Sequence, residues 1–311
     1  MSSVPIEFRN ETDQKAFDIF QESVHCIPEI EDDTIVYHYT SPEALMNITE
    51  EQCLWATDIN YLNDSSELRH TYSLVENLVK DNREKWHVDF CDSLSNQCLQ
   101  KLRKYDISNR LLFAQKTDFY VVSFSLDPDN LNMWKHYTKT ANSIGYNIGF
   151  RKNDLVAVSG LKYWTYGKVI YDEVNQKSIL DSVLSKYEAL YASQPDRFGR
   201  SQVFQMVMGT LEYFSAFFKH PAFSDEREFR IVIHNQIRLN REELCAIKYR
   251  VKDGVFIPYT TLPFSTNAVK SIGISPSEKQ KIAEYSVERM LEGKYALKYT
   301  DYFCSEIPFN P

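Results

Sequence analysis

The pattern of apolar and polar positions divides the chain into alternating strand-like and helix-like stretches. β-branched and aromatic residues at a two-residue period predict strands, and apolar residues at every third or fourth position predict helices. The predicted strands cover residues 34–39, 53–57, 118–125, 145–150, 161–171, 229–233, 245–251, 270–275 and 295–300. The predicted helices cover residues 13–26, 42–48, 67–80, 85–104, 111–116, 131–137, 178–193, 201–218 and 277–291.

The order strand, short helix, strand occurs twice in this pattern, at residues 34–57 and 118–150. Longer helices lie between the strand-rich parts. We therefore predict the α+β class, with one elaborated domain over residues 1–311 and helical insertions at about 66–116 and 178–218. The inserted helices either complete the core against the sheet or form a surface that binds a regulatory protein or a second copy of the chain.

Composition narrows the class of protein. The 311 residues include 43 acidic and 35 basic ones, and the net charge of −8 argues against a protein that coats nucleic acid through a broad basic surface. A local basic groove stays compatible with this charge. The six cysteines are scattered without a CxxC motif, which is typical of reduced thiols in a cytoplasmic protein and predicts no metal site.

Targeting and cofactor motifs are missing from the sequence. The first residues, MSSVPIEFRNETDQK, lack the charged start and apolar stretch of a secretory signal, so we expect none. No window approaches the roughly 18 consecutive apolar residues of a membrane span, and we expect a soluble, cytoplasmic protein without membrane contact. Neither GxGxxG nor GxxxxGK[ST] occurs, so a bound nucleotide has to be held by other means.

The most informative stretch is residues 221–233, PAFSDEREFRIVI. Alternate side chains of a strand point to the same face, so Glu226, Glu228 and Arg230 share one face as the chain enters an apolar strand. Burying unpaired charge is costly, so the arginine has to pair with a carboxylate while the other carboxylate reaches water or a ligand. The stretch therefore predicts either a structural ion pair or a catalytic or ligand-binding carboxylate.

Two further strands carry polar candidates. His38 ends the first strand and is followed by Tyr39 and Thr40, at a place where ligands gather, although such a histidine is also often structural. Ser123 and Ser125 flank Phe124 and therefore share a face, which a strand with one polar face also explains.

A loop and a short helix carry aromatic candidates. Tyr61 could stack on a planar ring, and Asn60 and Asn63 beside it could bond ribose hydroxyls, although an ordinary loop with Asx turns has the same composition. Trp134 and Tyr137 lie three residues apart on the short helix, a spacing typical of core residues and compatible with ligand contact.

Taken together, these pieces resemble the ADP-ribosyltransferase superfamily. The resemblance is carried by a histidine that ends an early strand, Ser123-Phe124-Ser125 on a middle strand, and Glu226-Arg227-Glu228 entering a late strand. The motifs YHYTS, LWATDINYLND, NLNMWKHY, IGYNIGF and F-x-x-E-x-E-x-R are similar, more narrowly, to a widespread bacterial family of formally unknown function placed in that superfamily. The resemblance runs from about residue 34 to residue 233.

The resemblance implies a split β-sheet core with helical insertions and NAD as the substrate. It implies that Glu228 holds the nicotinamide ribose 2′-hydroxyl and favours an oxocarbenium-like state, and that Glu226 orients or deprotonates the acceptor. Which of the two is catalytic stays open. Arg230 either neutralises Glu228 or clamps a phosphate. The expected NAD-binding residues are His38, Tyr39, Thr40, Asn60, Tyr61, Asn63, Ser123, Ser125, Trp134, Tyr137 and Arg230, with His38 on a ribose hydroxyl and Ser123 supporting the catalytic glutamate.

The favoured function is an NAD-dependent ADP-ribosyltransferase-like enzyme, by analogy a toxin or phage-defence effector, that acts on an unknown protein or nucleic-acid acceptor. One alternative is an NAD glycohydrolase, in which water is the acceptor. Another is a non-catalytic module that binds a nucleotide or nucleic acid through the same cleft, with the carboxylates and Arg230 locked in a structural network.

Overall fold

A computed structural model describes residues 10–62, 66–104, 119–137, 143–157, 164–234, 246–294, 297 and 300–308. The chain divides into two compact units, each assembled from three stretches of sequence. Unit 1 comprises Met1–Pro28, Leu62–Thr117 and Val169–Pro221, and unit 2 comprises Glu29–Tyr61, Asp118–Lys168 and Ala222–Pro311. The helical segments predicted at 66–116 and 178–218 fall in unit 1, together with the N-terminal helix.

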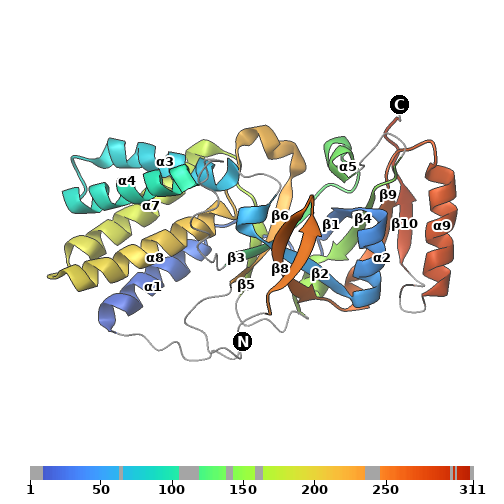
Figure 1. Cartoon of the computed structure of the whole chain (residues 1–311), viewed down its shortest axis with the longest axis horizontal. Coiled ribbons are helices and arrows are strands. Elements are labelled where there is room, and N and C mark those ends of the chain that lie inside the picture. Colours follow the sequence, from blue (N-terminus) through green and yellow to red (C-terminus); the bar gives the residue numbers. More distant parts are fainter. Residues whose placement is uncertain are drawn as a thin grey trace. The chain divides into compact units, whose positions relative to one another are not determined.

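Unit 1 is a bundle of helices. Helix α1 packs against α7 and α8, and α3 packs against α4, α7 and α8 (Figure 1). α7 begins at Glu173, earlier than predicted, because the side chain of Asp172 accepts hydrogen bonds from the backbone N–H groups of Val174 and Asn175 and caps the helix. The predicted piece at 111–116 lies outside the described residues. The helices are α1 (Glu11–Val24), α3 (Ser66–Asn82), α4 (Val88–Lys104), α7 (Glu173–Ala192) and α8 (Arg197–Ser215).

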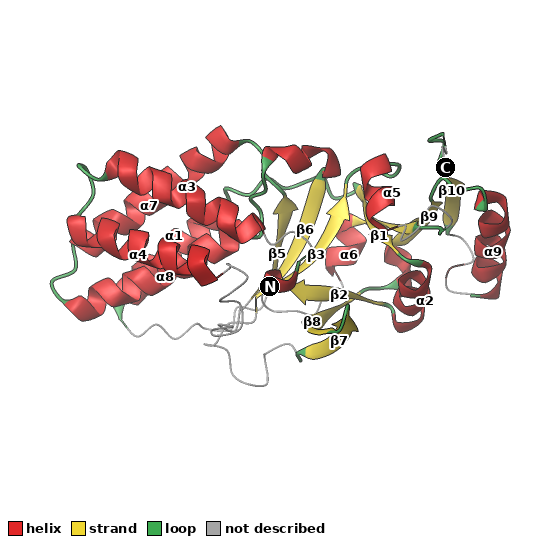
Figure 2. Ribbon diagram, turned by 45° about the horizontal axis from the view of Figure 1, so that its top comes forward, coloured by secondary structure: helices red, strands yellow, loops and turns green. Residues whose placement is uncertain are grey.

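Unit 2 is built on a mixed sheet of ten strands in the described residues (Figure 2). The strands follow the order β10-β9-β4-β1-β3-β2-β8-β7, and β6 pairs with both β3 and β5. The predicted α+β class is confirmed. The strands are β1 (Ile35–Thr40), β2 (Cys53–Asp58), β3 (Phe119–Ser125), β4 (Tyr146–Arg151), β5 (Trp164–Lys168), β6 (Glu228–His234), β7 (Lys248–Lys252), β8 (Val255–Pro263), β9 (Val269–Ile274) and β10 (Asp301–Cys304).

The sheet branches at β3. Strand β6 pairs along the whole of β3, from Phe119 to Ser125, and so occupies one edge of that strand. The other edge is shared, because β2 pairs at Tyr120 and Val121 while β1 pairs only at Ser125. Residues 122–124 of β3 lie between these two pairings and pair with no strand on that edge among the described residues, which leaves a gap between β1 and β2 beside Ser123.

The two faces of the sheet are covered differently. One face carries the main apolar core, which includes Val36, Phe124 and Phe229 and packs against α2 (Pro42–Glu51), α6 (Lys152–Ala157) and α9 (Gln280–Gly293). The opposite face carries a smaller cluster in which Tyr39 packs against α5 (Leu131–Tyr137). The alternation along β1 thus sends one set of side chains to each face.

Some predicted elements needed correction. The last strand in the described residues is β10, at Asp301–Cys304, and of the predicted strand at 295–300 only residues 297 and 300 are described, neither of them in a strand. Strand β5 covers Trp164–Lys168 and ends before the predicted residues 169–171, while 161–163 lie outside the described residues. Strand β8 and helix α6 were not predicted; β8 contains two prolines, Pro258 and Pro263, and prolines are uncommon inside strands. Short 3₁₀ helices occur at η1 (Ile59–Tyr61), η2 (Pro221–Glu226) and η3 (Thr266–Ala268).

None of the helices in the described part of the chain combines the length and apolar character needed to cross a membrane. The cysteines in that same part are free thiols.

Candidate active site

Glu228 and Arg230 form a buried ion pair on β6. Arg230 Nε donates to Glu228 Oε2 at 2.7 Å, and a terminal guanidinium nitrogen donates to Glu228 Oε1 at 3.1 Å. The exposed fractions of the two residues are 4% and 1%. The pair follows from the strand itself, since residues two apart share a face. Both oxygens of the carboxylate are therefore engaged by one guanidinium, the two-pronged geometry that arginine favours.

The two serines of β3 lie on the same face as this pair. In the antiparallel register Ser125 is opposite Glu228 and Ser123 is opposite Arg230. The Ser125 hydroxyl donates to the backbone carbonyl of Glu226 at 2.8 Å and accepts from the backbone N–H of Asp127 at 3.1 Å. Ser125 thus fixes the backbone beside the glutamates, whereas Ser123 is half-buried next to Arg230.

Glu226 differs from Glu228 in its surroundings. It ends η2 and is half-buried, and the next residue, Arg227, has a positive φ of 45°. A positive φ is unfavourable for a residue with a side chain, so the chain bends sharply between the two glutamates. The backbone N–H of Leu126 bonds the Arg227 carbonyl at 3.0 Å and holds this bend in place.

His38 lies at the gap between β1 and β2. Its Nδ1 lies 3.0 Å from the carbonyl oxygen of Ser123, and because a carbonyl only accepts, Nδ1 carries the hydrogen. Its ring also meets Phe124 edge to face at 5.7 Å. Burial, and to a smaller extent the charge of Arg250, lower the pKa of His38 below its ordinary value. The neutral ring at physiological pH therefore leaves Nε2 as a hydrogen-bond acceptor, which suits a ribose hydroxyl.

The loop that joins β3 to α5 is held by a dense network of hydrogen bonds. The Tyr39 hydroxyl donates to the carbonyl of Asp127 at 2.8 Å and accepts from the backbone N–H of Asn130 at 3.0 Å. Asp129 accepts from Trp134 Nε1 at 2.7 Å and from the Ser305 hydroxyl at 2.6 Å. The side-chain oxygen of Asn130 accepts from the backbone of α5 and caps that helix.

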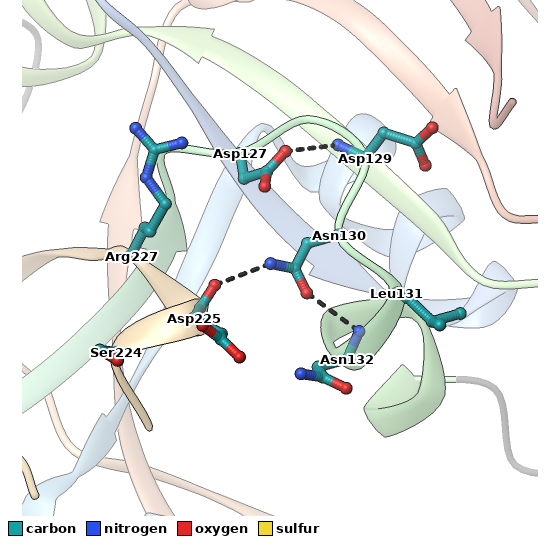
Figure 3. Close-up of a pocket in the computed structure, with 8 residues that line it drawn as sticks. All are labelled: Asp127, Asp129, Asn130, Leu131, Asn132, Ser224, Asp225 and Arg227. Atoms are coloured by element: carbon teal, nitrogen blue, oxygen red, sulfur yellow. Dashed lines mark hydrogen bonds between the residues drawn. The ribbon is translucent and has the colours of Figure 1, made fainter. Parts of the chain in front are cut away.

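This loop and the segment before β6 line a pocket of about 410 Å³ (Figure 3). Asn130 Nδ2 crosses between the two segments and donates to the carbonyl of Asp225 at 2.7 Å. Glu226 is flanked in sequence by two lining residues, so its backbone borders the pocket. The lining is formed by Asp127, Asp129, Asn130, Leu131, Asn132, Ser224, Asp225 and Arg227. Three carboxylates and one guanidinium give it an acidic character.

Tyr39 and Trp134 serve the architecture around this pocket. Their rings meet edge to face at 4.6 Å, both are almost completely buried, and their polar atoms bond the loop. Thr40 is also buried, at the end of β1 where it pairs with Tyr146. A role of these three side chains in binding NAD stays a prediction, and their observed contacts are structural.

The predicted loop residues are only partly described. Asn60 donates through its backbone and its side chain to Asp58 Oδ1, at 2.9 and 3.1 Å, in an Asx-type turn. Tyr61, at the end of η1, has an exposed fraction of 37% and so offers a ring face to solvent. Asn63 and the side chain of Tyr137 lie outside the described residues.

Asn147, which the sequence pattern did not point to, bonds the loop that lines the pocket. Its side chain donates to the carbonyl of Pro128 at 2.7 Å and accepts from the backbone N–H of Gly273 at 3.1 Å, and it is fully buried. A single asparagine thereby ties the pocket loop to β9. The polar residue inside the apolar motif IGYNIGF was the available signal, because a buried amide needs partners.

The nearby Gly149 is required by close packing. A Cβ at this position would meet the Tyr37 ring at 3.0 Å as well as the Ser271 hydroxyl. The absence of a side chain thus lets Tyr37 lie across β4 on the face that carries Ser125 and Glu228.

No group of three or more histidine, cysteine, aspartate or glutamate side chains suited to hold a metal ion occurs among the described residues.

Comparison with known proteins gives one family. Residues 133–231, less than half of the chain, match the model of a family described as a protein of unknown function (DUF2971). The match begins within α5 and ends within β6, so it includes Trp134, Glu226, Glu228 and Arg230. No curated protein matches the chain. The chain is thus similar, over these residues, to a family whose own description assigns no activity.

Proposed function

We propose that this protein is a cytoplasmic, NAD-dependent ADP-ribosyltransferase-like enzyme. The observation that supports the proposal is the branching of the sheet at β3, which brings together the ends of β1, β3 and β6. His38, Ser123 and Glu228 come from these three strands, in the chain order that the resemblance requires. Ser123 and Glu228 share one face of the sheet, whereas the His38 ring lies on the face of Val36 and Phe124 and meets this line through its bond to the Ser123 carbonyl. The branch itself depends on pairing between distant parts of the chain and is independent of the motifs that suggested the family.

The proposed reaction breaks the bond between nicotinamide and C1′ of its ribose. Nicotinamide leaves with the electron pair of that bond, and the ribose acquires oxocarbenium character. The Glu228 carboxylate holds the ribose 2′-hydroxyl and stabilises the developing positive charge. A nucleophile of the acceptor then bonds C1′ and loses its proton to Glu226, which lies in the chain between the pocket-lining Asp225 and Arg227.

Glu228 has to become accessible before it can act. Each of its oxygens bonds Arg230 and a carboxylate oxygen can accept a second hydrogen bond, but the residue has an exposed fraction of only 4%. His38 is already prepared for its part, since the bond from Nδ1 to Ser123 orients the ring and leaves Nε2 as an acceptor. NAD binding is therefore expected to require opening of the cover over Glu228 while leaving the histidine in place.

The test is incubation of the purified protein with NAD labelled in its adenylate part, with and without a lysate that contains protein and nucleic acid. Label retained on a macromolecule supports the transferase and identifies its acceptor class. Nicotinamide release that needs no macromolecule identifies a glycohydrolase instead. Glu226→Gln is the matched variant, since its side chain is half-buried, and Glu288→Gln on α9 is the exposed control outside the pocket.

A second candidate function is a non-catalytic module that binds a nucleotide or nucleic acid. It is favoured by the burial of Glu228 and by its two bonds to one guanidinium, which together satisfy the charge without a ligand. Calorimetric titration with NAD separates the two functions. Binding without release of nicotinamide, in the presence and absence of lysate, would support the module, and turnover would exclude it.

The role of a toxin or phage-defence effector is a further part of the proposal. If the activity is toxic, expression of the wild-type protein slows growth of a bacterial host, and the Glu226→Gln and His38→Asn variants do so less at equal protein levels. Equal growth inhibition by these variants and the wild type would argue against a catalytic origin of toxicity.

A further inference from the structure

One apolar face of the sheet runs out into the hairpin formed by β7 and β8. Residues two apart on β8 share a face, and Leu262 on that face lies in the main core, opposite Leu54 of β2. Along the same face the exposure increases toward the turn, because Leu262 is fully buried, Pro258 is half-buried and Phe256 has an exposed fraction of 69%. The outer end of this face is therefore an apolar sheet surface that is open to solvent.

Strand β7 widens this surface. Val251 lies opposite Phe256 and Tyr249 lies opposite Pro258, so these four side chains share one side of the hairpin, which we call the hairpin face. The exposed fractions of Tyr249 and Val251 are 65% and 68%. Large apolar side chains that gather on one exposed surface mark a place where another surface binds.

The charges of β7 lie on the other side of the hairpin. Lys248, Arg250 and Lys252 alternate with the apolar residues of the strand and point away from the hairpin face. On that side Arg250 donates to the Thr57 hydroxyl at 3.0 Å, and Thr57 lies opposite Val121, on the face of β3 that carries the two serines of the candidate site. The hairpin face is therefore uncharged, and a contact made by it lies on the opposite side of the sheet from the candidate site.

A second copy of the chain matches the hairpin face. Stacking of two such faces about a two-fold axis, with the sheets about 10 Å apart, covers both apolar surfaces and leaves the cations of both copies on the outer sides. Pairing of the two β7 strands edge to edge is a poor alternative, because an antiparallel alignment about Arg250 would bring Lys248 and Lys252 of the two copies opposite one another. Like charges directly opposite one another destabilise a strand pair.

A lipid surface suits the hairpin less well than a second copy does. β7 is the last strand on its side of the described sheet, so its outer edge would enter the apolar layer together with the hairpin face. Backbone groups on an open sheet edge are costly in that layer, whereas contact between two protein faces keeps the edge in water. The net charge of −8 also opposes the approach to an anionic membrane.

The exposed area sets the strength of the contact. Aromatic side chains bury roughly 150–250 Å² each, so Tyr249 and Phe256 together expose roughly 200–340 Å² per copy. Two copies would cover roughly 400–680 Å² of ring surface, to which Val251, Pro258 and the surrounding rim add. Stable interfaces bury about 1,200–2,000 Å² in total, so the contact corresponds to a weak, reversible dimer.

We propose that the hairpin faces of two copies pack against each other and form a weak homodimer. The proposal is carried by an apolar sheet face that continues the core into solvent and keeps every cation of β7 on its far side. It goes beyond the proposed enzymatic function and is tested without NAD, so the failure of one does not decide the other.

Sedimentation velocity of the whole protein, at concentrations from about 5 to about 500 µM, measures the association. We expect a monomer–dimer equilibrium with a dissociation constant on the order of 10–300 µM. Tyr249→Ala and Phe256→Ala each change both copies of the dimer and should each raise the dissociation constant by at least about 10-fold. Both side chains are exposed, so urea unfolding of the variants should match that of the wild type.

Matched controls lie on α9, where Ile282 and Tyr285 have exposed fractions of 66% and 61%. Ile282→Ala and Tyr285→Ala should leave the dissociation constant unchanged. Lys248→Glu separates the two arrangements of the dimer, because stacked faces leave this position on the outer side, where the change has little effect. Edge-to-edge pairing would instead place the carboxylate opposite Lys252 and tighten the dimer.

Three results would overturn the proposal. The first is a protein that stays monomeric up to about 500 µM, or a dimer that Tyr249→Ala and Phe256→Ala do not weaken. The second is tightening of the dimer by Lys248→Glu, which would replace face-to-face packing by edge pairing. The third is a monomer that binds vesicles of anionic phospholipid and loses this binding in Phe256→Ala, which would assign the hairpin face to lipid.

Discussion

Replacing Glu228 by glutamine tests whether the ion pair of β6 holds the fold together. The substitution removes the charge of the carboxylate that bonds Arg230 twice, and Arg230 is buried, with an exposed fraction of 1%. Removing one partner of a buried pair costs about 3–5 kcal/mol, and because glutamine retains one acceptor oxygen we expect about 3 kcal/mol. For a unit of this size the melting temperature should fall by roughly 6–12 °C.

The value is obtained from a double-mutant cycle. The free energy of unfolding in urea is measured for Glu228→Gln, for Arg230→Met and for the combined variant. The loss in the combined variant should be smaller than the sum of the two single losses by at least about 2 kcal/mol. The matched control is Arg227→Met, an exposed change in the same segment, expected to alter the free energy of unfolding by less than about 0.5 kcal/mol. Additivity of the two changes to within about 0.5 kcal/mol would refute a coupled, structural pair.

Three further predictions concern other polar groups of unit 2. Burial lowers the pKa of His234 to about 4 in the folded protein, whereas its pKa in the unfolded chain is about 6.5. As the pH falls, His234 therefore takes up a proton in the unfolded chain before it does so in the folded protein. The free energy of unfolding should therefore fall by about 1.4 kcal/mol per pH unit between these two pKa values. Urea unfolding at pH 7 and pH 5 measures this slope, and His234→Gln should remove it. An unchanged slope in the variant would contradict a buried, neutral His234. His38→Ala removes the side chain that donates to the Ser123 carbonyl and should lower the free energy of unfolding by about 1–3 kcal/mol. His38→Asn should restore the stability, but calorimetry should show weaker NAD binding than for the wild type. Equal NAD affinity of His38→Asn and the wild type would exclude a role for Nε2. Trp134→Phe removes the bond to Asp129 and should lower the free energy of unfolding by about 1.5–3 kcal/mol, while no change would mean that the bond is not formed in solution.

The local pattern of the sequence determined most of the elements and one central feature of the site. The spacing of Glu228 and Arg230 on an apolar strand was sufficient to place both on one face, because alternation along a strand is a property of its backbone. For the same reason the helices of unit 1 were recognised from their apolar period, with errors only at their ends.

Only the tertiary structure decided how those elements meet. The branch at β3, the bond from His38 to Ser123 and the link from Asn147 to the pocket loop all join residues far apart in the chain. The sequence left open whether Arg230 pairs with a carboxylate or clamps a phosphate, and the structure shows the pairing with Glu228. Such pairings depend on which strands become neighbours, and that choice is made by burial of the whole core and not by any local period.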